Sequence, residues 1–102
     1  MPASLVYLIH FARPYYHAKH YIGYTTREHY EERLAEHLSG RGARLLAAVN
    51  RAGISWSVVK VWRFDTTKEG RQHEKYLKHK SGVYHCPICQ GGQHATITLE
   101  NT

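Results

Sequence analysis

The sequence predicts an α+β fold, in which a three-stranded, mainly antiparallel sheet is flanked by helices in the order β-β-α-α-β-α. Three stretches are rich in the β-branched and aromatic residues that strands favour. Between and after them, apolar residues recur at the three- and four-residue spacing of amphipathic helices. The 102 residues suffice for one modest core. We expect a domain over residues 1–80 and a Cys/His-containing tail over 81–102, packed on the same domain.

The first two strands are expected to pair as a hairpin. Residues 4–12 form a nearly continuous apolar run that stops at Arg13-Pro14, which is typical of a buried strand. A polar and aromatic loop extends to residue 19, and residues 20–24 form a second, shorter strand.

Residues 27–38 are predicted as the first helix, because their apolar side chains recur at helical spacing. Thr25 and Thr26 are the expected N-caps, and Glu28 places a negative charge in the first turn, where the helix dipole favours it. A Ser-Gly-Arg-Gly stretch over residues 39–42 ends this helix.

Two further helices are predicted on either side of the third strand. The first covers roughly residues 43–52 and stops at Gly53. The second begins at Thr66, which has Glu69 three residues later, as in a capping box, and it runs to about residue 80.

The third strand is predicted over residues 54–64, which alternate in polarity. The alternation assigns four side chains to one face, and the apolar neighbours indicate that the other face is covered too. The four are Trp56, Val58, Lys60 and Trp62.

The charge of the chain favours a polyanionic partner. Its 14 Lys and Arg outnumber its 8 Asp and Glu, which gives a net charge of +6 at pH 7 with nine further histidines. Nucleic acid is the commonest polyanion, although a solvated basic surface would look the same. No apolar run approaches the length of a membrane span, and residues 1–4 lack the character of a signal peptide. We therefore expect a cytoplasmic protein without a membrane partner, nucleoid-associated if bacterial.

Several polar side chains stand at positions suited to phosphodiester chemistry. The first strand carries Tyr7, and the second carries Tyr-Ile-Gly over residues 21–23. The first helix carries Arg33 and His37, which share one face because they are four residues apart. Glu74 follows in the last helix, in line with the small and apolar residues of its inward stripe.

In this order and at these intervals, these residues resemble the GIY-YIG nuclease superfamily over residues 5 to about 80. The family's first motif appears as Leu5-Val6-Tyr7, which keeps only the tyrosine, and the second is intact as Tyr21-Ile22-Gly23. Residues 33–43 resemble a stretch of the small single-domain members. Residues 69–78 are similar to the family's last helix, in which a glutamate, here Glu74, is the metal ligand.

The resemblance implies a metal-dependent endonuclease that hydrolyses phosphodiester bonds. Glu74 would hold one Mg²⁺ or Mn²⁺ ion, which prefers oxygen ligands. Arg33 would grip a phosphate oxygen, and Tyr7 would serve as the general base if a neighbouring cation lowers its pKa. Tyr21 and His37 would orient water or phosphate and shuttle protons. Five further residues are expected to contact nucleic acid: Tyr24, Arg27, Arg41, Arg44 and Lys78.

Each of these residues also has a simpler structural interpretation. Tyr7 and Tyr21 could be core aromatics of the strands, and Arg33 could lie on a solvated helix face. His37 could be a half-buried histidine with its hydrogen bonds satisfied, and Glu74 could do no more than pair with a lysine one turn away.

The tail carries a second possible metal site. Cys86 and Cys89 have the Cys-x₂-Cys spacing that lets two thiolates bind one Zn²⁺ ion, and His94 or His79 could complete the set. Such a zinc would be structural, and free thiols or a redox pair are the alternatives.

Three functions are consistent with the sequence. The leading one is an endonuclease acting on DNA, duplex or branched, with RNA not excluded. A catalytically inactive nucleic-acid-binding module of the same fold and a zinc-stabilised adaptor are the alternatives. One small domain would reach a long recognition site only as a homodimer or with a partner protein.

Overall fold

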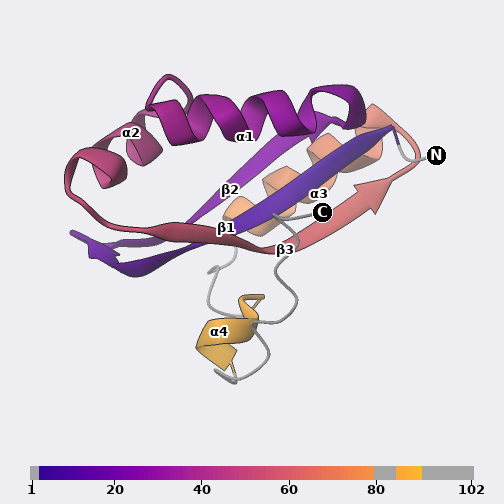
Figure 1. Cartoon of the computed structure of the whole chain (residues 1–102). Coiled ribbons are helices and arrows are strands. Elements are labelled where there is room, and N and C mark those ends of the chain that lie inside the picture. The colour runs from indigo at the N-terminus through magenta and orange to yellow at the C-terminus, as the bar shows by residue number, and fades with distance from the viewer. Residues whose placement is uncertain (1–2, 80–84, 91–102) are drawn as a thin grey trace.

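The computed structural model describes residues 3–79 and 85–90, and it confirms the α+β fold with a three-stranded antiparallel sheet (Figure 1). The expected order β-β-α-α-β-α is confirmed, with a short helix in the tail besides. The elements are β1 (Ser4–Tyr15), β2 (Ala18–Thr26), the 3₁₀ turn η1 (Arg27–His29), α1 (Tyr30–Ser39), α2 (Arg44–Arg51), β3 (Trp56–Phe64), α3 (Thr67–His79) and α4 (Pro87–Gln90).

β1 is the central strand of the sheet, because the strand order is β2-β1-β3. Tyr7 lies opposite Gly23 of β2 and opposite Val61 of β3. The run Leu5–Ile9 is buried on both faces of the sheet, which explains why its sequence is continuously apolar instead of alternating.

Each face of the sheet has its own apolar cluster. The cluster beneath α1 and α2 contains buried residues from β1, α2, β3 and the connection between α2 and β3: Tyr7, Ile9, Phe11, Leu46, Val49, Ile54 and Val58. On the other face, Leu8 and Val59 pack with Cys86, which precedes α4. Figure 1 shows α1 and α2 on one side of the sheet and α4 on the other.

α3 covers the face opposite α1. It packs against β1 and β2, and Gly70 in its first half lies against the side chains of Ser4 and Tyr24. Ser4 and Tyr24 stand an odd number of positions from Tyr7 and Gly23, and alternation along a strand therefore places them on the opposite face.

The hairpin is longer and tighter than the sequence suggested. β1 extends to Tyr15 and β2 begins at Ala18, so only Tyr16 and His17 lie between the strands. The expected loop over residues 13–19 is therefore wrong. A shift in pairing between His10 and Tyr15 accommodates Pro14, because proline is tolerated in strands at bulges.

The prediction that Trp56, Val58, Lys60 and Trp62 of β3 share one face of the sheet is also wrong. The pairing with β1 slips between Leu8 and Ile9, which places an extra residue, Val59, in β3. Such a bulge reverses the alternation on either side of it. Trp56 and Val58 therefore pack towards α1 and α2, whereas Trp62 packs on the opposite face with Leu8.

The helix starts differ in how they are capped. Thr26 precedes the 3₁₀ turn but makes no capping hydrogen bond, and its hydroxyl contacts His29 Nδ1 at 2.7 Å instead. Thr25 is a strand residue, so the expected threonine caps are wrong. The expected Thr66–Glu69 cap is present, because the Glu69 N–H donates to Thr66 Oγ1 at 3.1 Å.

Within the described ranges, none of the helices combines the length and apolar character that a bilayer span requires.

Replacing Gly70 by alanine should destabilise the domain, although alanine is the better helix former by about 1 kcal/mol. A methyl group at this position would overlap Ser4 Oγ. Ser4 is fully buried and its hydroxyl donates to Thr66 O at 2.8 Å, so it cannot move aside. We expect the free energy of unfolding in denaturant to fall by about 1–3 kcal/mol. Gln72→Ala, at an exposed position of α3, is the control; a more stable Gly70→Ala variant would contradict this packing.

Candidate active site

A buried hydrogen bond between Tyr7 and His37 forms the centre of the candidate site. Tyr7 Oη and His37 Nε2 are 2.7 Å apart, although the two residues are 30 positions apart in sequence. Both side chains are fully buried. The bond therefore joins the middle of β1 to the last turn of α1, away from competing water.

The second ring nitrogen of His37 indicates which atom carries the proton. The backbone N–H of Ala43 donates to His37 Nδ1 at 3.4 Å. Because a backbone N–H can only donate, Nδ1 must accept, and a neutral ring then carries its proton on Nε2. On this assignment His37 Nε2–H donates to the Tyr7 oxygen, which leaves the phenolic proton of Tyr7 directed elsewhere.

Two glycines make the close packing of this pair possible. A Cβ on Gly23 would overlap the phenol ring of Tyr7, and a Cβ on Gly42 would overlap His37 Nδ1. Steric fit thus explains the glycine of the Tyr-Ile-Gly motif, because this residue lies directly opposite Tyr7 in the sheet and a larger side chain would overlap the phenol ring.

The position of His37 is also fixed through its backbone. Asn50 of α2 donates its Nδ2 to His37 O at 2.8 Å, and Trp56 Nε1 of β3 donates to Asn50 Oδ1 at 2.9 Å. These hydrogen bonds connect α1, α2 and β3 around the histidine, so its ring orientation depends on three elements at once.

Tyr21 and Tyr30 surround the pair. The ring centroid of Tyr21 lies 6.3 Å from that of Tyr7 and 5.4 Å from that of His37. Tyr30 approaches Tyr7 edge-on, with centroids 5.9 Å apart. Tyr21 is only partly buried, so it is the member of the Tyr7–Tyr21–His37 group that faces solvent.

The surroundings keep both members of the central pair neutral. Burial, and next the charge of Arg33, lowers the pKa of His37 to about 4. Burial, and next the neighbouring Tyr21, raises the pKa of Tyr7 above its ordinary value, while Arg33 acts in the opposite direction. The raised pKa is opposite to the lowering expected of a general base beside a cation, since burial outweighs the guanidinium.

Arg33 lies at the edge of this group and remains charged. Its Nη1 forms an ion pair with Glu36 Oε1 at 3.1 Å. Burial acts to lower the pKa of Arg33, but the Glu36 hydrogen bond and the two tyrosines Tyr7 and Tyr21 outweigh it and raise the pKa. The cation is thus electrostatically coupled to both tyrosines from a partly exposed position.

Glu74 stands apart from the other four expected catalytic residues. It lies on α3, which covers the opposite face of the sheet, and its Oε2 pairs with Lys78 Nζ at 3.2 Å. The relative solvent exposure of the Glu74 side chain is 23%. β2 is an edge strand, so groups from both faces can meet a ligand that lies along that edge.

The residues expected to contact nucleic acid have varied surroundings. Arg27, Arg41 and Arg44 are exposed. Tyr24 is partly buried, and the guanidinium of Arg71 lies 4.8 Å from its ring centroid as a cation–π pair. Arg71 is thus a further cation beside β2 that the sequence analysis did not single out.

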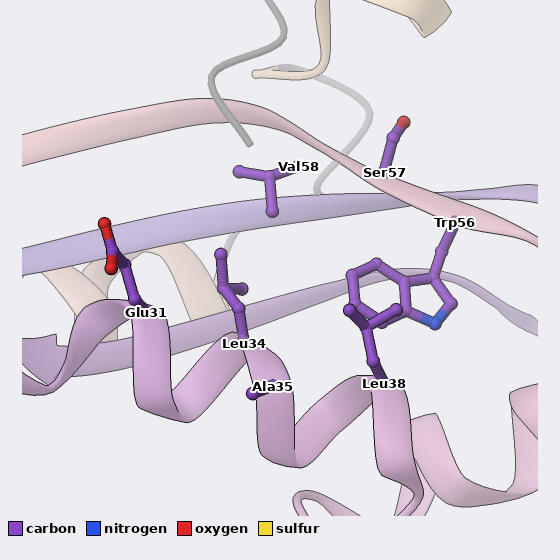
Figure 2. Close-up of a pocket in the computed structure, with 7 residues that line it drawn as sticks. All are labelled: Glu31, Leu34, Ala35, Leu38, Trp56, Ser57 and Val58. Atoms are coloured by element: carbon purple, nitrogen blue, oxygen red, sulfur yellow. The ribbon is translucent and has the colours of Figure 1, made fainter. Parts of the chain in front are cut away.

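An apolar pocket of about 370 Å³ lies between α1 and β3 (Figure 2). Figure 2 shows Leu38 and Trp56 side by side in its wall, with Glu31 at the other end. Its lining offers one carboxylate and no cation, so it does not suit an anionic phosphate.

On the opposite face, four potential metal ligands converge. His10, His20, Cys86 and Cys89 each offer one ligand atom, and these atoms all lie within 4.8 Å of one another. The expected cysteines are present in this group, but the histidines differ from those expected. His79 is exposed at the end of α3 and outside the group, whereas His94 lies outside the described residues.

Sequence reasoning missed the residues that hold the central pair and those that join the cysteines. Asn50 and Trp56 gave no motif signal. His10 and His20 could have been noticed as polar residues at the ends of two apolar strands, but their pairing depends on the irregular hairpin register.

One comparison with known proteins gives a match. The model of the family described as the GIY-YIG catalytic domain matches residues 3–84, most of the chain. Among curated proteins and solved structures, none matches.

The neutral state of buried His37 should make acid destabilising. Between pH 6.5 and about 4, His37 binds a proton in the unfolded chain but not in the folded one. The free energy of unfolding therefore falls as the pH falls through that range. The slope from this one group is at most about 1.4 kcal/mol per pH unit. His37→Gln should therefore flatten the acid limb in denaturant unfolding measured at several pH values. An NMR titration giving His37 a pKa near its ordinary value would contradict the burial argument.

Proposed function

The chain belongs to the GIY-YIG family, a nuclease-type superfamily, and from that premise we propose that it is a divalent-metal-dependent endonuclease that hydrolyses phosphodiester bonds in DNA. The observation that carries the proposal is the Tyr7–His37 hydrogen bond, with Tyr21 and Arg33 beside it. A core tyrosine needs no histidine partner and no adjacent cation, whereas a proton-transfer site uses both.

The proposed proton transfer runs from the attacking water, which Tyr21 orients, to the oxygen of Tyr7. Tyr21, which is partly exposed, contacts and orients the attacking water. Tyr7 acts as the general base in its phenolate form: its own phenolic proton is first released to solvent, and the phenolate oxygen then accepts a proton from the attacking water. His37 Nε2–H donates to the Tyr7 oxygen and thereby stabilises its phenolate form, which burial alone disfavours.

Arg33 is assigned to the phosphate. Its guanidinium stays charged and partly exposed, and it can donate two parallel hydrogen bonds to non-bridging oxygens. Charge on the phosphate grows as water attacks, so these bonds strengthen in the transition state. The present partner, Glu36, lies one turn away on the exposed helix surface and is a weak competitor for the guanidinium.

Glu74 is assigned to the metal. A Mg²⁺ or Mn²⁺ ion, when bound, supplies Lewis-acid stabilisation of charge on the phosphate and the leaving group. The donor fits this kind of ion, because a partly exposed carboxylate can hold a hard cation that keeps most of its waters. Lys78, 3.2 Å from the carboxylate, would move to a phosphate when the ion binds.

DNA is the proposed substrate, and the positive charge of the chain supports contact with a nucleic-acid backbone. Arg27, Arg41 and Arg44 are exposed and contribute to the net charge of +6. They suit contacts with the phosphates of a nucleic-acid backbone. The partly buried Tyr24, covered by Arg71, lies on β2 on the face that α3 covers. Duplex and branched DNA are both candidate substrates.

Replacing Glu74 by glutamine should abolish cleavage but not binding. Loss of the carboxylate removes the proposed metal ligand while keeping the shape of α3, and we expect the cleavage rate to fall by roughly 10²–10⁴-fold. The measurement is cleavage of supercoiled plasmid and branched DNA with Mg²⁺ or Mn²⁺, alongside DNA affinity in a gel-shift assay.

Glu32→Gln is the matched control, because Glu32 is an exposed carboxylate on α1. It should cleave like wild type. Cleavage that survives Glu74→Gln would overturn the assigned metal ligand. DNA binding with no cleavage by the wild type would favour an inactive binding module, and cleavage of RNA alone would overturn the assigned substrate.

A further inference from the structure

We propose that His10, His20, Cys86 and Cys89 bind one Zn²⁺ ion in a tetrahedral structural site that fixes α4 to the β1–β2 hairpin. This inference concerns the face of the sheet opposite the Tyr7–His37 pair and does not depend on the proposed nuclease activity. The proposed partners of the cysteines are two strand histidines in place of His79, and the expectation for His94 lies outside the described residues.

Four of the six distances between the ligand atoms are close to those of a zinc tetrahedron, and all six are within 4.8 Å. With Zn–N bonds of about 2.0–2.1 Å and Zn–S bonds of about 2.3 Å, two nitrogens lie about 3.3 Å apart, and a nitrogen and a sulfur about 3.6 Å apart. His10 Nδ1 and His20 Nε2 are 3.3 Å apart. The described nitrogen–sulfur separations are 3.3 Å, 3.7 Å and 3.4 Å.

The fold brings these ligands together from distant parts of the chain. His10 and His20 lie opposite each other in β1 and β2, so their side chains share one face of the sheet. Cys86 immediately precedes α4 and Cys89 lies within it. Sequence separations of up to 79 residues are closed at this one point, although α4 has only four residues.

The chemistry of the set selects zinc. Two thiolates and two imidazoles form the S₂N₂ donor set of structural zinc sites, whereas magnesium and calcium prefer oxygen. Both cysteines are free, and each contacts His10. The four side chains lie on the face of the sheet opposite the Tyr7–His37 pair, so the proposed catalytic chemistry does not account for them.

Zinc binding would stabilise the position of α4 on the sheet. Cys86 is fully buried against Leu8 and Val59, but a helix of four residues adds little apolar area, so a bound metal would strengthen the attachment of α4 to the sheet. His20 immediately precedes Tyr21 in the edge strand. Fixing His20 would therefore also restrain the position of Tyr21 on the opposite face.

The test is metal analysis of the full chain purified without chelator. We expect one Zn²⁺ ion per chain by mass spectrometry of the metal content. Replacement by Co²⁺ should give the visible spectrum of tetrahedral coordination, with thiolate-to-cobalt charge transfer from two sulfurs. A chain that holds no zinc and gives no such spectrum would overturn the proposal, as would a Cys86–Cys89 disulfide that persists in the presence of a thiol reductant.

Variants separate the assigned ligands from other histidines and from the proposed active site. Cys89→Ser, at an exposed position, and His20→Gln should each weaken zinc binding at least about tenfold in chelator competition. His79→Ala and Glu74→Gln should bind zinc like wild type. Equal affinity in Cys89→Ser, His20→Gln and wild type would overturn the assignment.

Discussion

The hydrogen bond between Tyr7 and His37 is the interaction around which the rest of this structure is arranged. It joins the central strand to α1 at a point closed to water, so both side chains must be neutral and mutually satisfied. Gly23 and Gly42 leave room for the rings, and the hydrogen bonds of Asn50 hold the histidine backbone. A fully buried polar pair in a small core costs stability unless it is fully paired, which accounts for the number of elements that support it.

The sheet carries two polar sites on opposite faces, and β2 contributes to both. Tyr21 of this strand faces the Tyr7–His37 pair, and its neighbour His20 faces the cysteines before and within α4. Because β2 is an edge strand, its outer side is open to a ligand, and rigidity there must come from its side chains. The proposed zinc site would supply that rigidity without touching the proposed chemistry.

The sequence predicted elements well where a local pattern determines them, and failed where register decides. The buried run of β1, the spacing of Arg33 and His37, and the Thr66–Glu69 cap are short-range signals. The extra residue Val59 and the slip after His10 are set by packing between strands, and they reversed a predicted face and hid the His10–His20 pair. The motif residues identified the centre of the site, but Asn50 and Trp56, which hold His37 through side-chain hydrogen bonds, belong to no motif. The separation of Glu74 from that centre follows from the three-dimensional placement of α3.

The central claim is that Tyr7 and His37 act as one proton-transfer unit. A double-mutant cycle on the DNA cleavage rate tests it most directly, with Tyr7→Phe, His37→Gln and the combined variant compared at one pH and one metal concentration. Residues that act as a unit are strongly non-additive, so each single change should slow cleavage about as much as both together. Losses that multiply in the combined variant, or a Tyr7→Phe variant that cleaves like wild type, would contradict the claim.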